Sequence, residues 1–386
     1  MTGFSDSIDT FYRRARAARG LEDFGEDDYR EALEVLCNSL DEDASLTPVG
    51  EFAIQAMIVD ALEARLLVEE GHRLHPEAAD ARIERPLVIV GLPRTGTTAL
   101  HHLIGQDPAF QGLEHWLARS PKPRPPREHW EEDRDYRAAV ERVRMIYERS
   151  PDMRAIHEIE ADLPDECWNV FSQNFAHGSW EANADVHRYA RWWADYDMTP
   201  TYRRHRRTAQ LIGHREPERR WLFKDATHLF DLNALFEIYP DALIVQTHRD
   251  PVEVIPSVCS LCWSSRSAIN VGTDVRSFGR STLELWERAT RNMLKVRAER
   301  NPRQFFDLSF EHFVADAVAA IREIYEAFGI EYSDEADRAI RSFREANPRA
   351  KHGEHRYTVE EWGLDADEIS QRFAEYAEAH DVRMSS

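Results

Sequence analysis

The chain has 386 residues, of which 42% are hydrophobic, so it is long and apolar enough to bury a large core. Its formal net charge of −21 argues against nucleic acid or an anionic membrane as the main partner, because both are polyanions, and it disfavours a highly sulfated or phosphorylated acceptor. Residues 1–19 contain no apolar segment typical of a secretory signal, no apolar run has the length of a membrane span, and only four cysteines occur. We therefore expect a cytoplasmic protein.

The first half of the chain predicts helices, then one strand, and then more helices. Residues 7–75 show helical periodicity of their apolar positions. Residues 87–90 form a short continuous apolar run, which is typical of a central parallel strand that is buried on both faces. A helix is expected over about 97–105, a Pro-rich surface loop over 120–128, and a mostly helical segment over 129–215.

Strand signals return in the second half of the chain, at residues 221–223, 242–245 and 305–308, and a long helix is expected over about 274–300. Alternation of strands and helices predicts an α/β fold, a P-loop-like doubly wound parallel sheet flanked by helices, in which ligands bind at the carboxyl ends of the strands. The expected regions are an N-terminal helical region at 1–80, an α/β domain at 81–360 with a helical, substrate-lining insertion at about 120–218, and a C-terminal helical tail at 361–386.

A loop with phosphate-binding spacing links the strand at 87–90 to the helix that follows it. Gly91 and Gly96 have the G-x-x-x-x-G spacing of a P-loop, and glycines let a backbone approach an anion closely. N–H groups at the start of the helix would face the anion, and Arg94 adds a cation. The alternative is an ordinary glycine-containing turn, but the order of strand, loop and helix favours anion binding. The residues expected to contact the anion are Arg94, Thr95, Gly96, Thr97 and Thr98.

The loop lacks the lysine of nucleoside-triphosphate enzymes, because Thr97 stands at its position. Those enzymes also hold Mg²⁺ with an acid that ends a second strand. Here the strand at 242–246 runs into Thr247, His248 and Arg249, and no acid ends it. The acid that follows the strand at 221–223, Asp225, comes after Lys224. The pattern therefore predicts an anion bound without a metal ion, in preference to ATP with Mg²⁺.

A second anion site is expected where the strand at 242–245 ends. Arg249 follows that strand, Asp250 is a suitable N-cap for the next helix and Pro251 a suitable first helical residue. Ser257 lies eight residues after Arg249, two turns into the helix, so its hydroxyl and the guanidinium can share one phosphate. The alternative is that Arg249 only pairs with Asp250 or Glu253. Two such sites on neighbouring strands indicate a ligand with two separated anionic ends.

In these motifs the chain resembles the PAPS-dependent sulfotransferases, particularly their bacterial branch. Residues 93–98 resemble the family's 5′-phosphosulfate loop, and Arg249 with Ser257 resembles its 3′-phosphate pair. Arg94 stands where many members carry lysine, which keeps the charge but changes its geometry. Residues 224–229 resemble a segment in which bacterial members place a lysine and a histidine. Near the C-terminus, a segment resembles the tail that closes over the cofactor: His355, Arg356 and Tyr357.

The resemblance spans about residues 86–360. It implies that the protein binds 3′-phosphoadenosine-5′-phosphosulfate (PAPS), releases adenosine 3′,5′-bisphosphate, and transfers the sulfonate in line and without metal to a hydroxyl or amine of a small-molecule acceptor. Arg94 and the loop N–H groups would stabilise charge at the 5′ end, and Lys224 would add a second cation.

Two residues are candidates for the general base. Glu114 is favoured, because many sulfotransferases carry a catalytic glutamate in this part of the chain and Gly112 permits a tight bend that returns the chain to the sheet. His228 is the alternative, although it follows Lys224 by four residues where the family's cytosolic members have two. Reserve candidates are His115, His157, Glu160 and Glu166.

Two other functions stay open from the sequence. One is a P-loop kinase-type phosphotransferase, and the other is a catalytically inactive nucleotide-binding protein of the same fold. Aromatic residues between 168 and 196 either line an acceptor pocket or, as is more frequent, belong to the core. Arginines between 203 and 220 either form a rim for an anionic ligand or, in the interpretation that we favour, a solvated helix face that balances the acidic surface.

Overall fold

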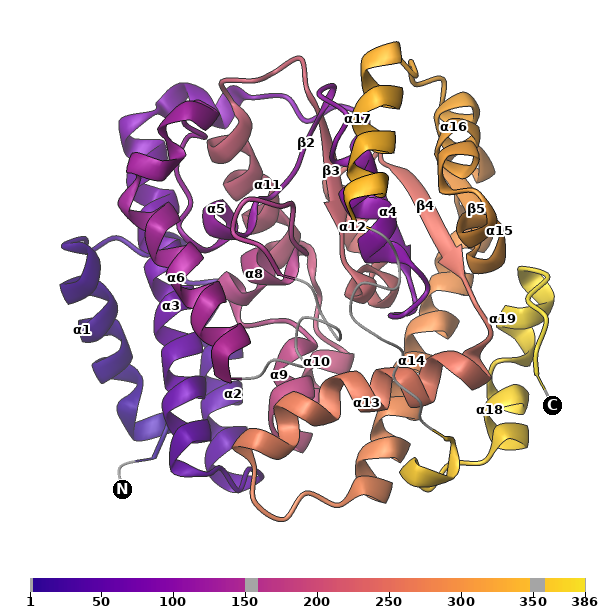
Figure 1. Ribbon diagram of the computed structural model, residues 1–386. Helices are drawn as coiled ribbons and strands as arrows, with labels where there is room; N and C mark the ends of the chain where they lie inside the picture. Colours follow the sequence, from indigo (N-terminus) through magenta and orange to yellow (C-terminus); the bar gives the residue numbers. More distant parts are fainter. Residues whose placement is uncertain (1–2, 150–158, 348–357, 386) are drawn as a thin grey trace.

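The computed structural model describes residues 3–149, 159–347 and 358–385. At its centre lies one parallel sheet with the strand order β2-β3-β1-β4-β5 (Figure 1). The strands are β1 (Leu87–Gly91), β2 (Phe110–Gln111), β3 (Arg220–Lys224), β4 (Leu243–His248) and β5 (Phe305–Ser309). The predicted α/β fold is confirmed, and β2 is the strand that the sequence pattern did not predict.

Different helices cover the two faces of the sheet. Leu87 and Ile89 of β1 pack with one cluster, and Val88 and Val90 with another, because alternate residues of a strand point to opposite faces. This double burial explains the unbroken apolar run of β1. The first face is covered by α4 (Thr97–Ile104), α15 (Phe310–Ala315), α16 (Ala317–Phe328) and α17 (Asp334–Ala346), and the second by α11 (Thr199–Gly213), α12 (Leu232–Ile238) and α14 (Val275–Glu299).

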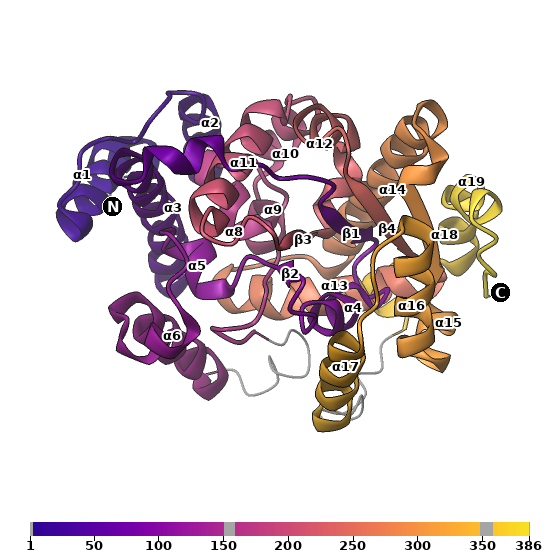
Figure 2. The same cartoon turned by 90° about the horizontal axis from the view of Figure 1, so that it is seen from above.

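Three helices form the N-terminal end of the molecule: α1 (Ile8–Arg19), α2 (Arg30–Glu42) and α3 (Pro48–Leu74). Figure 2 shows them at the opposite end from α18 (Ala366–Arg372) and α19 (Ala374–Ala379). Helix α3 begins with Pro48 after Thr47, whose hydroxyl accepts a hydrogen bond from the Gly50 N–H. It packs closely on α13 (Pro251–Ile269), since a Cβ on Gly50 would lie 2.1 Å from the Ile269 carbonyl oxygen.

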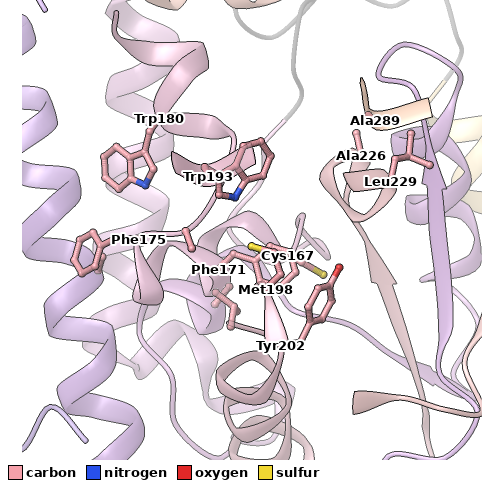
Figure 3. Close-up of a cluster of buried hydrophobic side chains, with 14 of the residues drawn as sticks. Cys167, Phe171, Phe175, Trp180, Trp193, Met198, Tyr202, Ala226, Leu229 and Ala289 are labelled. Atoms are coloured by element: carbon pink, nitrogen blue, oxygen red, sulfur yellow. The ribbon is translucent and has the colours of Figure 1, made fainter. Parts of the chain in front are cut away.

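The middle of the chain is helical, as predicted, with α5 (His115–Arg119), α6 (Arg134–Arg149), α8 (Trp168–Phe171), α9 (Ser179–Asn183) and α10 (His187–Ala194). Many of its aromatic side chains belong to the core. Phe171, Phe175, Trp180 and Trp193 are buried in one hydrophobic cluster, which Figure 3 shows together with Tyr202 of α11. These residues fix the helices against one another.

The interpretation of the arginine run as a solvated face is wrong for Arg204. Its side chain is buried on α11, where it forms an ion pair with Glu69 and donates to the Arg65 carbonyl oxygen at 2.9 Å and to Gln173 Oε1 at 2.8 Å. Arg207 pairs with the same glutamate at 2.7 Å. Arg204 therefore ties α11 to α3 and is satisfied by partners inside the protein.

The C-terminal helices lie near the carboxyl end of β4. Helix α18 contacts α13, α19 contacts α14, and the Tyr376 hydroxyl lies 3.0 Å from His248 Nδ1 at the end of β4. Among the residues that the structure describes, no helix is both long and apolar enough to cross a membrane. The division of the chain at residues 80 and 360 stays a prediction.

Candidate functional site

The phosphate loop leaves β1 at Gly91 and enters α4 at Thr97. A Cβ on Gly91 would lie 2.3 Å from the Thr247 hydroxyl oxygen, so only glycine lets β1 end this close to β4. Gly96 has a φ of 90°, and Arg94 also has a positive φ, 69°. A non-glycine residue in this region is strained, and such strain is found preferentially at binding loops.

The start of α4 provides the donors that an anion needs. The first N–H groups of a helix have no intrahelical partner and lie at the positive end of its dipole. Gly96, Thr97 and Thr98 line a large cavity, together with Arg94. Thr95 differs from the prediction, because its hydroxyl donates to the Leu92 carbonyl oxygen at 2.6 Å and its side chain is buried inside the loop.

The structure brings the second predicted motif to the same loop. Arg249 donates to the Arg94 carbonyl oxygen at 3.0 Å, and its guanidinium lies 4.3 Å from the centre of the Phe310 ring. Arg94 Nε donates to the Ser257 hydroxyl at 3.2 Å. Arg249 also pairs with Glu253 at 2.7 Å, which was the alternative interpretation. The pair with Glu253 is half exposed and does not prevent Arg249 from lining the cavity.

The cavity has a volume of about 710 Å³ and extends from the phosphate loop to α9, α13 and α14. At the loop end it is lined by the cations Arg94, Lys224 and Arg249, although the chain as a whole is strongly acidic. Lys224 is buried at the end of β3, where Nζ donates to the Thr98 hydroxyl at 2.9 Å and forms an ion pair with Glu166. This end of the cavity is suited to an anion.

A long-range backbone pairing delivers Glu166 to this position. Residues 161–165 run antiparallel to residues 113–116, with hydrogen bonds from the His115 N–H to the Leu163 carbonyl oxygen at 3.1 Å and from the Asp165 N–H to the Leu113 carbonyl oxygen at 2.8 Å. The Cys167 N–H then donates to the Lys224 carbonyl oxygen at 3.0 Å. Glu166 is thereby held at the carboxyl edge of the sheet.

A hydrogen-bonded chain of His177, Thr227 and Asp225 lines the cavity next to Lys224. The Ser179 N–H donates to His177 Nδ1 at 3.0 Å, so in the neutral ring Nε2 carries the proton and donates to the Thr227 hydroxyl at 3.0 Å. That hydroxyl donates to Asp225 at 2.7 Å. Burial raises the pKa of Asp225, but the hydrogen bonds and charges of its neighbours outweigh burial and lower it. Both nitrogens of His177 are therefore engaged.

Glu114 does not lie where the sequence argument placed it. The chain does return to the sheet, as β2, but the Glu114 side chain is buried beside Arg124, whose Nη2 donates to it at 3.0 Å. Arg124 also pairs with Glu216 at 2.5 Å and with the Gly112 carbonyl oxygen at 2.6 Å. Glu114 is absent from the described residues that line the cavity. Its ion pair with the Arg124 guanidinium therefore keeps the Glu114 carboxylate outside the cavity lining.

His228 is also buried and outside the cavity lining. Its Nδ1 lies 2.7 Å from the Tyr202 hydroxyl, and its ring packs edge-on against Phe171 at 5.5 Å. Burial lowers the pKa of His228 to about 4. The geometry is that of a neutral core histidine.

Two reserve candidates, His115 and Glu160, are placed less favourably than Glu166. His115 Nδ1 lies 2.6 Å from Asp165, and its ring is buried away from the cavity. Glu160 lines a smaller cavity that shares Lys224 and Glu166 with the large one. The residues that lie outside the described part of the chain are His157, His355, Arg356 and Tyr357.

Two groups of side chains among the described residues bring ligand atoms close enough to share a metal ion. They are His75 with Glu77 and His214, and His248 with Asp307 and His380. Neither group contributes a residue to the cavity. The loop end of the cavity carries three cations, Arg94, Lys224 and Arg249, which are suited to sulfate or phosphate groups.

Comparison with known proteins agrees with this geometry. Residues 86–334 match the model of a family described as the sulfotransferase family. The sulfotransferase STF1 from Mycobacterium tuberculosis H37Rv is 38% identical, with 95% of this chain and 98% of that one aligned at a TM-score of 0.88. STF9 from Mycobacterium avium is 28% identical, with coverage of 100% and 98% and a TM-score of 0.90. A search of curated proteins gave no match.

Proposed function

Because the chain belongs to the sulfotransferase family, we propose that it moves a sulfonate group from PAPS to a hydroxyl or amine of a small-molecule acceptor. One observation carries the proposal. The phosphate loop, Arg249 and the Lys224–Glu166 pair line a single cavity, so two anion sites and a carboxylate face the same space.

The residues present fit a donor with two anionic ends. Arg94 and the N–H groups of Gly96, Thr97 and Thr98 would hold the 5′-phosphosulfate, and Arg249 would hold the 3′-phosphate together with Ser257, whose hydroxyl accepts from Arg94. PAPS supplies the activated sulfonate. The face of Phe310 and the guanidinium of Arg249 form one wall of this end.

We assign the general base to Glu166 in place of Glu114 and His228. Its carboxylate lines the cavity and already contacts a cation, whereas the two other candidates are held by partners in the core. Lys224 Nζ has three donors and contacts both Glu166 and Thr98, so it can move its charge toward a developing anion while Glu166 accepts the acceptor's proton. Lys224 and Glu166 can do this with small side-chain movements, because they already contact each other and Lys224 contacts Thr98.

Calorimetry tests the proposal directly. The protein should bind adenosine 3′,5′-bisphosphate without Mg²⁺ and should bind ATP with Mg²⁺ much more weakly, and turnover of PAPS should persist in EDTA. Tight binding of ATP with Mg²⁺ and transfer of its γ-phosphate would instead identify a kinase-type phosphotransferase. An inactive protein of the same fold would bind the bisphosphate but would neither transfer the sulfonate of PAPS nor hydrolyse PAPS slowly.

A further inference from the structure

Beyond the phosphate loop, the cavity is lined by large apolar side chains. We call six of them the apolar wall: Trp168, Phe230, Leu261, Phe278, Leu285 and Trp286. They come from α8, the turn after β3, α13 and α14. The charged groups of the donor gain nothing from such a surface and its adenine ring can cover only part of it, whereas the binding sites of organic molecules are typically lined in this way. We therefore assign most of the wall to the acceptor.

One carboxylate interrupts the apolar surroundings of the acceptor region. Glu181 of α9 lines the cavity, and its Oε2 is buried with no hydrogen-bond partner among the described residues. The hydroxyl of Ser179 on the same helix is likewise buried, without a partner, and in the lining. Buried polar atoms are nearly always paired, and among the described residues these two have no partner, so both are available to a bound molecule.

The nearby arginines do not fill this role. Arg266 donates to the main-chain oxygen of Glu181 at 2.5 Å and forms an ion pair with Asp185, and Arg288 lies over the rings of Trp193 and Phe230. Burial raises the pKa of Glu181, and the charges that oppose this shift are those of Arg288, Arg266 and His187. None of these three groups belongs to the Lys224–Glu166 pair or to the phosphate loop.

We propose that the acceptor is a large, mainly apolar alcohol with a second, neutral hydrogen-bond donor that binds Glu181. The inference rests on the proposed function. The apolar wall would contact the carbon skeleton, Glu166 the hydroxyl that receives the sulfonate, and Glu181 the second donor. A neutral donor such as a hydroxyl suits the site better than a cation, because Arg266 and Arg288 already place positive charge beside this carboxylate.

A ladder of α,ω-alkanediols from butanediol to tetradecanediol, each with its mono-alcohol, tests the inference on the full chain. Affinity is measured by tryptophan fluorescence in the presence of adenosine 3′,5′-bisphosphate, and turnover is measured with PAPS. We expect one long diol to bind about 10-fold or more tightly than its mono-alcohol, which is the usual effect of one hydrogen bond to a charged group. Butanediol should bind weakly, because it cannot cover the apolar wall.

Variants of the chain separate the contribution of Glu181 to acceptor binding from that of the apolar wall. Glu181→Leu should abolish the preference for the diol while keeping affinity for the mono-alcohol, and Leu285→Asp should weaken both. Glu284→Leu, on the exposed face of α14, is the matched control and should change neither. A preference that survives Glu181→Leu, or equal binding of short and long diols, would overturn the inference. Failure to bind adenosine 3′,5′-bisphosphate would instead overturn the proposed function, so the two failures are distinguishable.

Discussion

The ion pair of Lys224 and Glu166 is the contact on which the proposed chemistry depends. The Lys224 ammonium group contacts the Glu166 carboxylate, and both side chains also line the cavity. Lys224 also donates a hydrogen bond to the hydroxyl of Thr98, which belongs to the first turn of α4. In the proposed reaction these few atoms would therefore connect the donor's sulfonate end to the acceptor.

Glu166→Gln should lower turnover about 100-fold or more, because an amide cannot accept the proton that a general base removes. The affinity for adenosine 3′,5′-bisphosphate should stay nearly unchanged in calorimetry. Glu114→Gln is the comparison. It removes one partner of a buried ion pair, so we expect a loss of about 3–5 kcal/mol in the free energy of unfolding with turnover per folded molecule retained. The reverse pattern would return the base to Glu114.

Arg249→Ala should weaken binding of adenosine 3′,5′-bisphosphate about 10- to 100-fold, which corresponds to the loss of one charge-assisted contact. An analogue without the 3′-phosphate should bind the variant and the natural protein alike. Calorimetry with both ligands measures this difference. Equal losses would mean that Arg249 supports the loop through the Arg94 carbonyl oxygen and does not bind the 3′-phosphate.

At the scale of the elements, local patterns were sufficient for the centre of the sheet and the phosphate loop. An unbroken apolar run predicted β1, and the glycine spacing placed the loop before α4, because both signals lie within a few residues. Strand β2 has two residues, too few for a periodic signal. The position of Glu114 depends on Arg124 in a Pro-rich segment, and that of Glu166 on pairing with residues 113–116. Neither long-range contact leaves a sign in the local sequence.

The contact between α3 and α13 depends on a missing side chain. Gly50→Ala would place a methyl group 2.1 Å from the Ile269 carbonyl oxygen, so one helix has to move. We expect a loss of about 1–3 kcal/mol in the free energy of unfolding, the usual cost of overpacking, measured by urea denaturation. Val49→Ala at an exposed neighbouring position is the control and should have little effect. An unchanged midpoint for Gly50→Ala would show that the helices separate easily here.

At the scale of the whole molecule, several histidines are buried in their neutral form. Burial lowers the pKa of His205 to about 3 and of His228 and His248 to about 4. In the unfolded chain these groups titrate near 6.5. Since the unfolded state binds more protons between these values, the folded state is favoured above pH 6.5 and loses that advantage as the pH falls toward 4.

Urea denaturation at pH 7.5, 6 and 5 should therefore show a falling free energy of unfolding, by about 1.4 kcal/mol per pH unit for each buried histidine once the pH is below 6.5. His228→Gln should reduce this slope, because one titrating group is removed. The control variant is His312→Gln, because His312 is exposed and pairs with Glu323 at the surface. This change should leave the pH dependence of the free energy of unfolding nearly unchanged. A constant stability between pH 7 and pH 5 would contradict the neutral assignment.

The strand order has a consequence for the growing chain. Strand β1 lies at the centre of the sheet, but both of its neighbours, β3 and β4, are made only when the ribosome has reached residues 220–248. Until then the apolar strand β1 has no hydrogen-bonded neighbour along either edge, and an unpaired strand of this kind is prone to aggregation. Loops of this length also make sheet formation slow. Helices α1, α2 and α3 precede β1 in the chain, and α4 to α11 precede β3, so these helices are available to shield β1 during synthesis.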